Sequence, residues 1–106
     1  MRAAMATAAT LVYPHTVKQP GYCGGKAAID NTRVRVNNVA WLAKQGLTPQ
    51  QVLEHYPDLT LAQVHAALAY YYDNTDEIEA ELAAEEQAAA DFEREKVELL
   101  DKRARR

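Results

Sequence analysis

Apolar residues recur at helical spacing in the middle of the chain, and helix-ending signals divide them into three short segments. Gly46 provides a C-terminal stop for the first segment. The second and third segments each follow a threonine that has a glutamine three residues later, which is the pattern of a capping box. The pattern predicts one helix over residues 37–45, one from the Thr48 cap to near Pro57, and one from the Thr60 cap to about Asp73.

The second and third predicted helices are joined by a turn of only a few residues. A short helix, a tight turn and a longer helix form the pattern of a helix-turn-helix. At about 100° per residue, the third helix has two unlike faces. The apolar face, which we expect in the core, consists of Leu61, Val64, Leu68, Tyr71 and Tyr72. The opposite face, which we expect to meet solvent or a ligand, consists of Gln63, Ala66, Tyr70 and Asp73.

A β-hairpin is predicted before the helices. Residues 26–29 and 32–36 favour two strands, and Asp30-Asn31 suits a tight turn between them because Asn and Asp tolerate positive φ. Residues 10–13 favour a further short strand. Residues 14–25 hold two prolines and three glycines, so we expect a loop there. The predicted fold is therefore mainly α, with an N-terminal hairpin and a three-helix unit.

Residues 76–103 contain no proline or glycine and are rich in alanine and glutamate, so they predict one long helix. Glu85 and Lys96 interrupt its thin apolar stripe, whereas a coiled coil requires a filled seam. The broken stripe suits a helix that lies in a groove of another protein, although the acidic face could instead be only solvated. The apolar stripe consists of Ile78, Leu82, Ala89, Phe92, Leu99 and Leu100.

The length of 106 residues allows one small domain with an extension. We expect a disordered tail over residues 1–9, a domain for DNA binding and dimerisation over residues 10–75, and a partner-binding helix over residues 76–106. A core of about sixty residues is marginal alone, so dimerisation or a partner is expected. Trp41 is expected in the core or a dimer interface, and His65 is expected to be packed and hydrogen-bonded.

Charge differs between the two parts of the chain. Residues 1–75 carry six Lys/Arg and four Asp/Glu, a net charge of +2, whereas residues 76–106 carry six and eleven, a net charge of −5. These two values sum to the −3 of the whole chain. The first part can therefore approach phosphate, and the helix mostly cannot. A single cysteine excludes an internal disulfide, and no apolar run approaches the roughly 20 residues of a membrane span. We expect a cytoplasmic protein.

The sequence offers little that resembles catalytic chemistry. Gly24-Gly25-Lys26 lacks the spacing of a phosphate-binding loop. The three histidines and Cys23 do not have the spacing of a metal site, and no nucleophile is matched with a base. We therefore predict that the protein is not an enzyme and uses no cofactor or metal.

Several of these motifs, taken in order, resemble a known family. They match the small prokaryotic family called domain of unknown function 433, whose members are regarded as predicted antitoxins. The resemblance spans roughly residues 12–73. Ala27 and Asn31 depart from the family's habitual Pro and Gly, but Asn also accepts positive φ, so we expect the turn to survive. The matching elements are Gly25-Lys26, Ile29, Thr32-Arg33-Val34, Val36, Gly46-Leu47-Thr48, Val52-Leu53, Tyr56-Pro57, Leu59-Thr60 and Val64 through Ala69-Tyr70.

The resemblance implies the antitoxin of a type II toxin–antitoxin pair, which represses its own operon through the helix-turn-helix. It also implies a toxin partner, often a nuclease with a PIN-like fold, that is, an acidic-cluster, metal-dependent ribonuclease. A homodimer or a hetero-oligomer with the toxin is expected. The alternative is a dimeric interaction module that does not bind DNA.

DNA affinity would have to come mainly from cations outside the third helix, which carries no Arg or Lys. Arg33 and Arg35 share one face of a predicted strand and could clamp phosphate. Alternatively, they could form only a solvated face, or Arg33 could pair with a carboxylate such as Asp30. Gln63 could pair with adenine, or could only complete the cap while Tyr70 packs on a second copy. The predicted DNA-binding residues are Lys26, Arg33, Arg35, Lys44, Thr60, Gln63, Ala66 and Tyr70.

The long helix is the predicted toxin-binding element. Phe92 is expected to be its aromatic anchor, and Glu85 and Lys96 are expected to meet opposite charges on the toxin. The predicted toxin-binding residues are Ile78, Leu82, Glu85, Ala89, Phe92, Lys96, Leu99 and Leu100.

Overall fold

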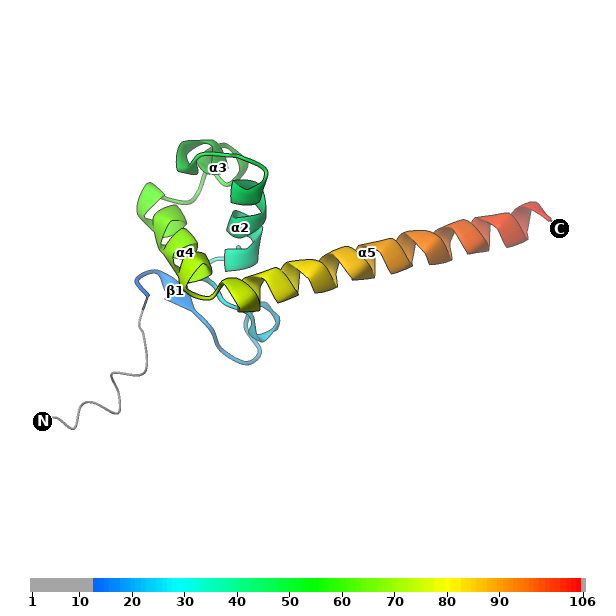
Figure 1. Ribbon diagram of the computed structural model, residues 1–106, viewed down its shortest axis with the longest axis horizontal. Coiled ribbons are helices and arrows are strands. Elements are labelled where there is room, and N and C mark those ends of the chain that lie inside the picture. Colours follow the sequence, from blue (N-terminus) through cyan, green and yellow to red (C-terminus); the bar gives the residue numbers. More distant parts are fainter. Residues whose placement is uncertain (1–12, 106) are drawn as a thin grey trace, which may run out of the picture.

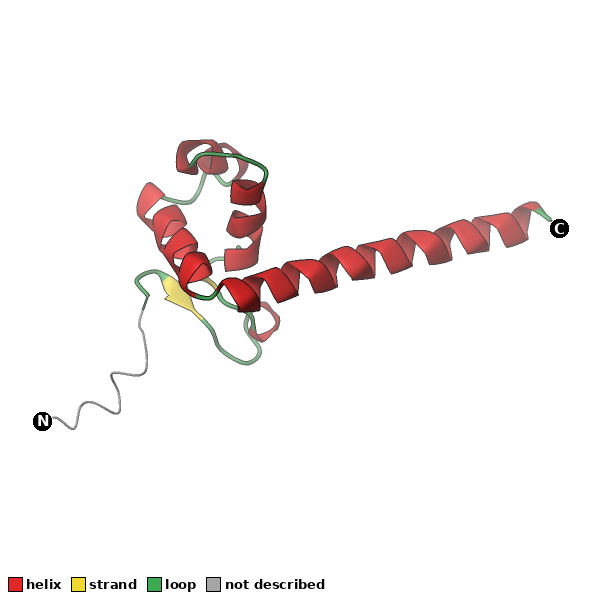
Figure 2. Cartoon of the chain, viewed as in Figure 1, coloured by secondary structure: helices red, strands yellow, loops and turns green. Residues whose placement is uncertain are grey.

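The elements follow the predicted order in the computed structural model, which describes residues 13–105. The mainly α fold with a short N-terminal hairpin and a long last helix is confirmed. The predicted tail over residues 1–9, and residues 10–12 of the first predicted strand, lie outside the described residues. Figure 2 shows α5 leaving the other elements as one helix. The elements are β1 (Thr16–Val17), the 3₁₀-helix η1 (Cys23–Gly25), β2 (Ala28–Ile29), α2 (Val36–Lys44), α3 (Pro49–His55), α4 (Leu61–Asp73) and α5 (Thr75–Ala104).

Both predicted capping boxes are present. The Thr48 hydroxyl accepts from the Gln51 N–H at 3.2 Å, and the Gln51 side chain accepts from the Thr48 N–H at 2.8 Å. Thr60 and Gln63 make the same pair of bonds at 3.1 and 2.8 Å. These bonds satisfy N–H groups that have no partner inside the helix, so α3 and α4 begin where the sequence predicted.

The β-structure differs from the prediction in its partners. β2 pairs antiparallel with β1, which lies in the segment predicted to be a loop. The predicted strand over residues 32–36 contributes only one bridge, between Ala28 and Arg35. The predicted turn is present, with Asn31 at a φ of 62°. The second strand is cut short because Arg35 is already the N-cap of α2.

The buried face of α4 is rotated relative to the predicted one. Val64, Ala67 and Tyr71 are buried, whereas Leu61 and Tyr72, both predicted to be core, are 38% and 66% exposed. Ala67 is fully buried in the core that α4 forms with α2, so the buried stripe lies closer to Ala67 than predicted. The prediction for Leu61 and Tyr72 was therefore wrong.

Two further side chains lie outside the core. Trp41 on α2 is 52% exposed, because the buried face of that helix is formed by its other apolar residues. His65 on α4 is exposed and makes no hydrogen bond within residues 13–105, so the prediction of a packed histidine was wrong. Trp41 is free of the core and available to a partner.

The long helix α5 has two different parts. Its inner half, residues 75–86, packs on α2 and α4, and Ile78 is fully buried in the core formed with them. Its outer half, residues 87–105, is exposed along nearly its whole length. Figure 1 shows this half projecting away from the cluster of α2, α3 and α4. The unit predicted to end at residue 75 therefore takes part of its core from α5.

Candidate functional site

A fully buried asparagine joins the inner half of α5 to α2. The Asn37 Nδ2 donates to Glu81 Oε1 at 2.8 Å and to Glu85 Oε2 at 3.2 Å. Its Oδ1 is also buried and accepts no hydrogen bond from any of the described residues. The two hydrogen bonds from the Asn37 side-chain amide help to hold the inner half of α5 against α2. Both acceptors are carboxylates, and hydrogen bonds to charged groups are stronger than those between neutral groups.

Three of the four cations predicted to bind phosphate face carboxylates of α5. Lys26 Nζ and Arg35 Nη1 each lie 3.6 Å from Glu85 Oε2, and Lys44 Nζ lies 2.6 Å from Glu79 Oε1. Arg33 is exposed and makes no ion pair within the described part of the chain. The acidic inner half of α5 therefore screens most of the predicted phosphate-binding charge.

Glu79 sits between two donors from different helices. The Lys44 ammonium and, secondly, the Tyr71 hydroxyl donate to it, and together they hold the pKa of the Glu79 carboxyl below its usual value. The hydrogen bond to Glu79, together with burial, raises the pKa of Tyr71 to about 12. This three-residue contact links α2, α4 and α5.

The residues of α4 that were predicted to read DNA are partly engaged inside the chain. Thr60 and Gln63 cap the helix for each other, and Ala66 is half-buried. The Tyr70 hydroxyl donates to Glu77 at 2.9 Å, and its ring lies edge-on to Tyr13 with centroids 4.9 Å apart. Burial, followed by the bond to Glu77, raises the pKa of Tyr70. Tyr70 thus stabilises the contact between α4 and α5 and does not project outward.

The predicted toxin-binding residues divide between the two halves of α5. Ile78 is buried, Leu82 packs against the core, and Glu85 is bound to α2 and its neighbours. Ala89, Phe92, Lys96, Leu99 and Leu100 are exposed on the outer half. Only these last five are available to a partner in this structure.

The exposed residues of the outer half form a stripe with a shallow hollow of about 390 Å³. At about 100° per residue, Phe92 and Leu99 lie on the same side of the helix as Ile78 and Glu85. The face that α5 packs on its own unit therefore continues, uncovered, along the outer half. We call this surface the outer stripe, and it is lined by Phe92, Glu95, Lys96, Leu99, Leu100 and Arg103.

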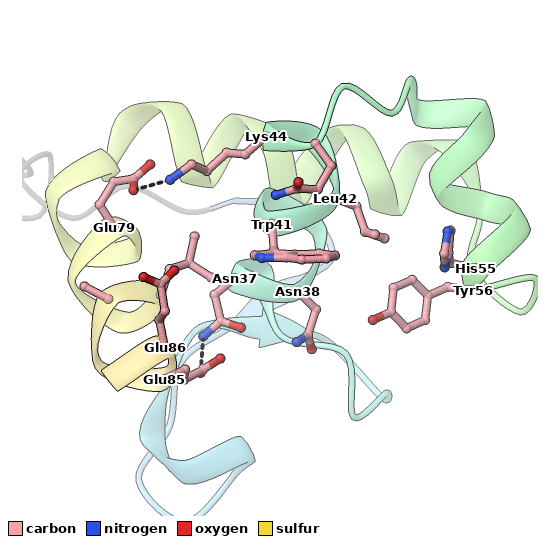
Figure 3. Close-up of a pocket in the computed structure, with 13 residues that line it drawn as sticks. Asn37, Asn38, Trp41, Leu42, Lys44, His55, Tyr56, Glu79, Glu85 and Glu86 are labelled. Atoms are coloured by element: carbon pink, nitrogen blue, oxygen red, sulfur yellow. Dashed lines mark hydrogen bonds and ion pairs between the residues drawn. The ribbon is translucent and has the colours of Figure 1, made fainter. Parts of the chain in front are cut away.

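A second hollow lies between α2, α3 and the inner half of α5, and has a volume of about 680 Å³. We call it the Trp41 groove. Figure 3 shows Trp41 between Glu79 and Glu86 on one side and His55 and Tyr56 on the other. The groove was not predicted from the sequence, because its walls come from three helices. A helical wheel of α2 could have indicated it, since Trp41 falls opposite the buried residues of that helix.

Comparison with known proteins places the chain in a family. Residues 17–71 match the family described as "Protein of unknown function (DUF433)". The chain belongs to this family. A crystal structure of a DUF433 member protein from Anabaena variabilis ATCC 29413, at 2.00 Å resolution, is 38% identical, with a TM-score of 0.61. The similarity covers 65% of this chain and 68% of that chain. No protein with a curated description matches the chain.

The DUF433 match begins at Val17 in β1 and ends at Tyr71 in α4, before α5 begins. The family description assigns no function, so the residues themselves must support one. Within residues 13–105, no helix combines the length and the apolar character needed to cross a membrane. The same residues bring together no group of three or more His, Cys, Asp or Glu side chains suited to a metal ion.

Proposed function

We propose that this DUF433 protein is the antitoxin of a type II toxin–antitoxin pair and acts in the cytoplasm. The observation that supports the proposal is the division of α5 into a docked inner half and a projecting outer half with a bare apolar stripe. A helix that is fixed at one end and exposes apolar residues at the other is suited to a groove on a partner protein. The toxin, by the family resemblance, is a PIN-like ribonuclease.

The charge of the outer stripe indicates the kind of toxin surface that would accept it. Lys96 lies between Phe92 and Leu99, and Arg103 lies one turn beyond Leu99. An apolar groove edged with carboxylates is complementary to the stripe. The acidic cluster of a PIN-like ribonuclease would be such a surface, and a helix laid over it would block the enzyme.

Repression of the operon is the second part of the proposal, with α3, the turn and α4 as the helix-turn-helix. Arg33 is the cation best placed for it, because it is exposed and is not held by a carboxylate of the described residues. One observation favours the alternative of an interaction module that does not bind DNA. Lys26, Arg35 and Lys44 are all occupied by Glu79 or Glu85.

Toxin binding is tested by co-expression with the product of the neighbouring gene and purification through a tag on that product. A chain that ends after Ala90 keeps the buried Ile78 and loses the outer stripe, so it should fold but not co-purify. Phe92→Ala should weaken the complex by more than ~2 kcal/mol, as expected for an aromatic anchor.

Val97→Ala is the matched control. Val97 is 61% exposed, similar to Phe92 at 65%, but it does not line the outer stripe. It should bind as the unchanged chain does. If the chain that ends after Ala90 still holds the toxin and suppresses its toxicity, the toxin site lies elsewhere and the proposal fails. Fluorescence anisotropy of labelled upstream DNA tests the helix-turn-helix separately. Binding would support a repressor, and no binding would support the interaction module.

A further inference from the structure

The Trp41 groove carries features of a contact surface that the proposed function does not use. Trp41 is the only tryptophan of the chain and is 52% exposed, with Tyr56 on the opposite wall. Tryptophan and tyrosine are enriched at the centres of protein interfaces, where their large rings contribute much of the binding energy. An exposed tryptophan inside a groove therefore indicates a site for a polypeptide segment.

The groove is lined by carboxylates, one of which has no cationic partner among the described residues. Three glutamates line it, and two of them, Glu79 and Glu85, are ion-paired with cations of the chain. Glu86 makes no ion pair or hydrogen bond within residues 13–105. This carboxylate, in the same groove as the exposed Trp41, favours a segment that brings positive charge, because complementary charges stabilise an interface.

The chain itself contains such a segment at the end of α5. Lys102, Arg103 and Arg105 are exposed, and of these only Arg105 has an ion-pair partner among the described residues, Asp101 at 3.0 Å. Seventeen residues separate Glu86 from Arg103, a rise of about 26 Å at 1.5 Å per residue. Because α5 is one unbroken helix, its basic end cannot reach the groove of its own copy.

We propose that the Trp41 groove receives the basic end of α5, residues 102–105, from a second copy of the chain. Two copies would exchange these ends in a closed dimer, with their α5 helices antiparallel. A two-fold arrangement makes both contacts identical, so each copy supplies one groove and one basic end. Each contact would place Arg103 of one copy beside Glu86 of the other and would cover Trp41.

A second observation fits this arrangement. Val97 and Leu100 are 61% and 52% exposed on the outer half of α5. At about 100° per residue, they lie toward the side of the helix that carries Ala83 and Glu86, which line the groove. An antiparallel α5 lying along that side would cover both. Leu100 and Arg103 also line the outer stripe, so a bound toxin and a second copy would compete for them. Self-association is measured without the toxin, so this inference can fail while the proposed function stands, and the reverse.

The test is a charge exchange measured by sedimentation equilibrium of the full chain, at concentrations on the order of tens of micromolar. The unchanged chain should be a dimer that dissociates on dilution and in high salt. Glu86→Arg and Arg103→Glu should each weaken self-association at least about tenfold, because each places like charges opposite one another. Mixed together, the two variants should form a heterodimer, since one of its two contacts is unchanged and the other has its charges swapped.

Matched controls carry the same charge changes away from the groove. Glu54→Arg and Arg33→Glu alter exposed residues that do not line it, and both should leave the dimer intact. Trp41 fluorescence gives an independent readout, because its emission should shift to shorter wavelength as the dimer forms.

Three results would overturn the proposal. The unchanged chain could remain a monomer at these concentrations, or a dimer could persist in both groove variants. The two variants could also dissociate without re-forming a dimer when mixed. A groove that is filled by a partner protein instead would give the first of these results.

Discussion

The Tyr71 hydroxyl on α4 donates a hydrogen bond to Glu79 on α5 at 2.6 Å. The same carboxylate lies 2.6 Å from Lys44 Nζ on α2, so one acid joins three helices. Each partner alters the other's protonation: the pKa of Glu79 is lowered and that of Tyr71 is raised to about 12. Docking of the inner half of α5 therefore depends on an ionised Glu79 and a neutral Tyr71.

Stability should fall with acid partly through Glu79. A carboxyl whose pKa is lowered by folding contributes stability above its usual pKa of 4.5, and this contribution is lost as pH falls through the folded-state value. Glu79→Gln removes that contribution, so the variant should lose less stability than the unchanged chain between neutral and acidic pH. Urea unfolding at pH 7 and pH 3 measures it. Glu98→Gln, at an exposed position of the outer half, is the control; equal pH dependence for all three chains would contradict the prediction.

Stability should also fall with alkali through Tyr71. A tyrosine whose pKa is raised by folding contributes stability that is complete below the usual value of 10 and is lost as pH rises through about 12. In an absorbance titration, Tyr71→Phe should remove one late-ionising tyrosine. A late phase of equal amplitude in Tyr71→Phe and the unchanged chain would refute the assignment.

The two halves of α5 should respond differently to truncation of an apolar side chain. Ile78 is fully buried, so Ile78→Ala should lower the free energy of unfolding by about 3 kcal/mol. Leu99 is 63% exposed, so Leu99→Ala should change it by less than ~0.5 kcal/mol. Urea unfolding of the full chain at neutral pH compares them, and similar losses would mean that the outer half is also packed.

If the chain binds its upstream DNA, Arg33 should be the most sensitive cation of the hairpin. Arg33→Ala should weaken binding and reduce the slope of log K against log salt by about one unit, as expected for one lost phosphate contact. Lys18→Ala is the control, because Lys18 is already ion-paired with Glu77 at 3.2 Å. Equal affinity and slope for Arg33→Ala and the unchanged chain would show that this turn does not touch DNA.

Release of the screened cations should raise DNA affinity. Glu85→Gln keeps the shape of the side chain but removes the charge that pairs with Lys26 and Arg35. Both cations would then be available to phosphate, so affinity and salt dependence should both increase. Glu81→Gln, one turn away and bound to Asn37 but to neither cation, is the matched control. No increase with Glu85→Gln would favour the interaction module that does not bind DNA.

Sequence reasoning located the helices because their signals are local. The Thr48–Gln51 and Thr60–Gln63 boxes need only residues three positions apart, and such contacts form whatever the rest of the chain does. The positive φ of Asn31 is likewise a property of one residue in a tight turn. The length of α5 followed from the absence of proline and glycine over its span.

The partners of these elements depended on contacts between distant residues. Asn37 and Glu85 are 48 residues apart in the chain, and no periodicity relates them. The division of α5 near residue 86, and the screening of Lys26, Arg35 and Lys44, both follow from how that helix docks on α2. β1 is two residues long, too short to show alternation, and pairs with β2 across an intervening loop. Local preferences could predict each element, but the side that each one buries was set by packing.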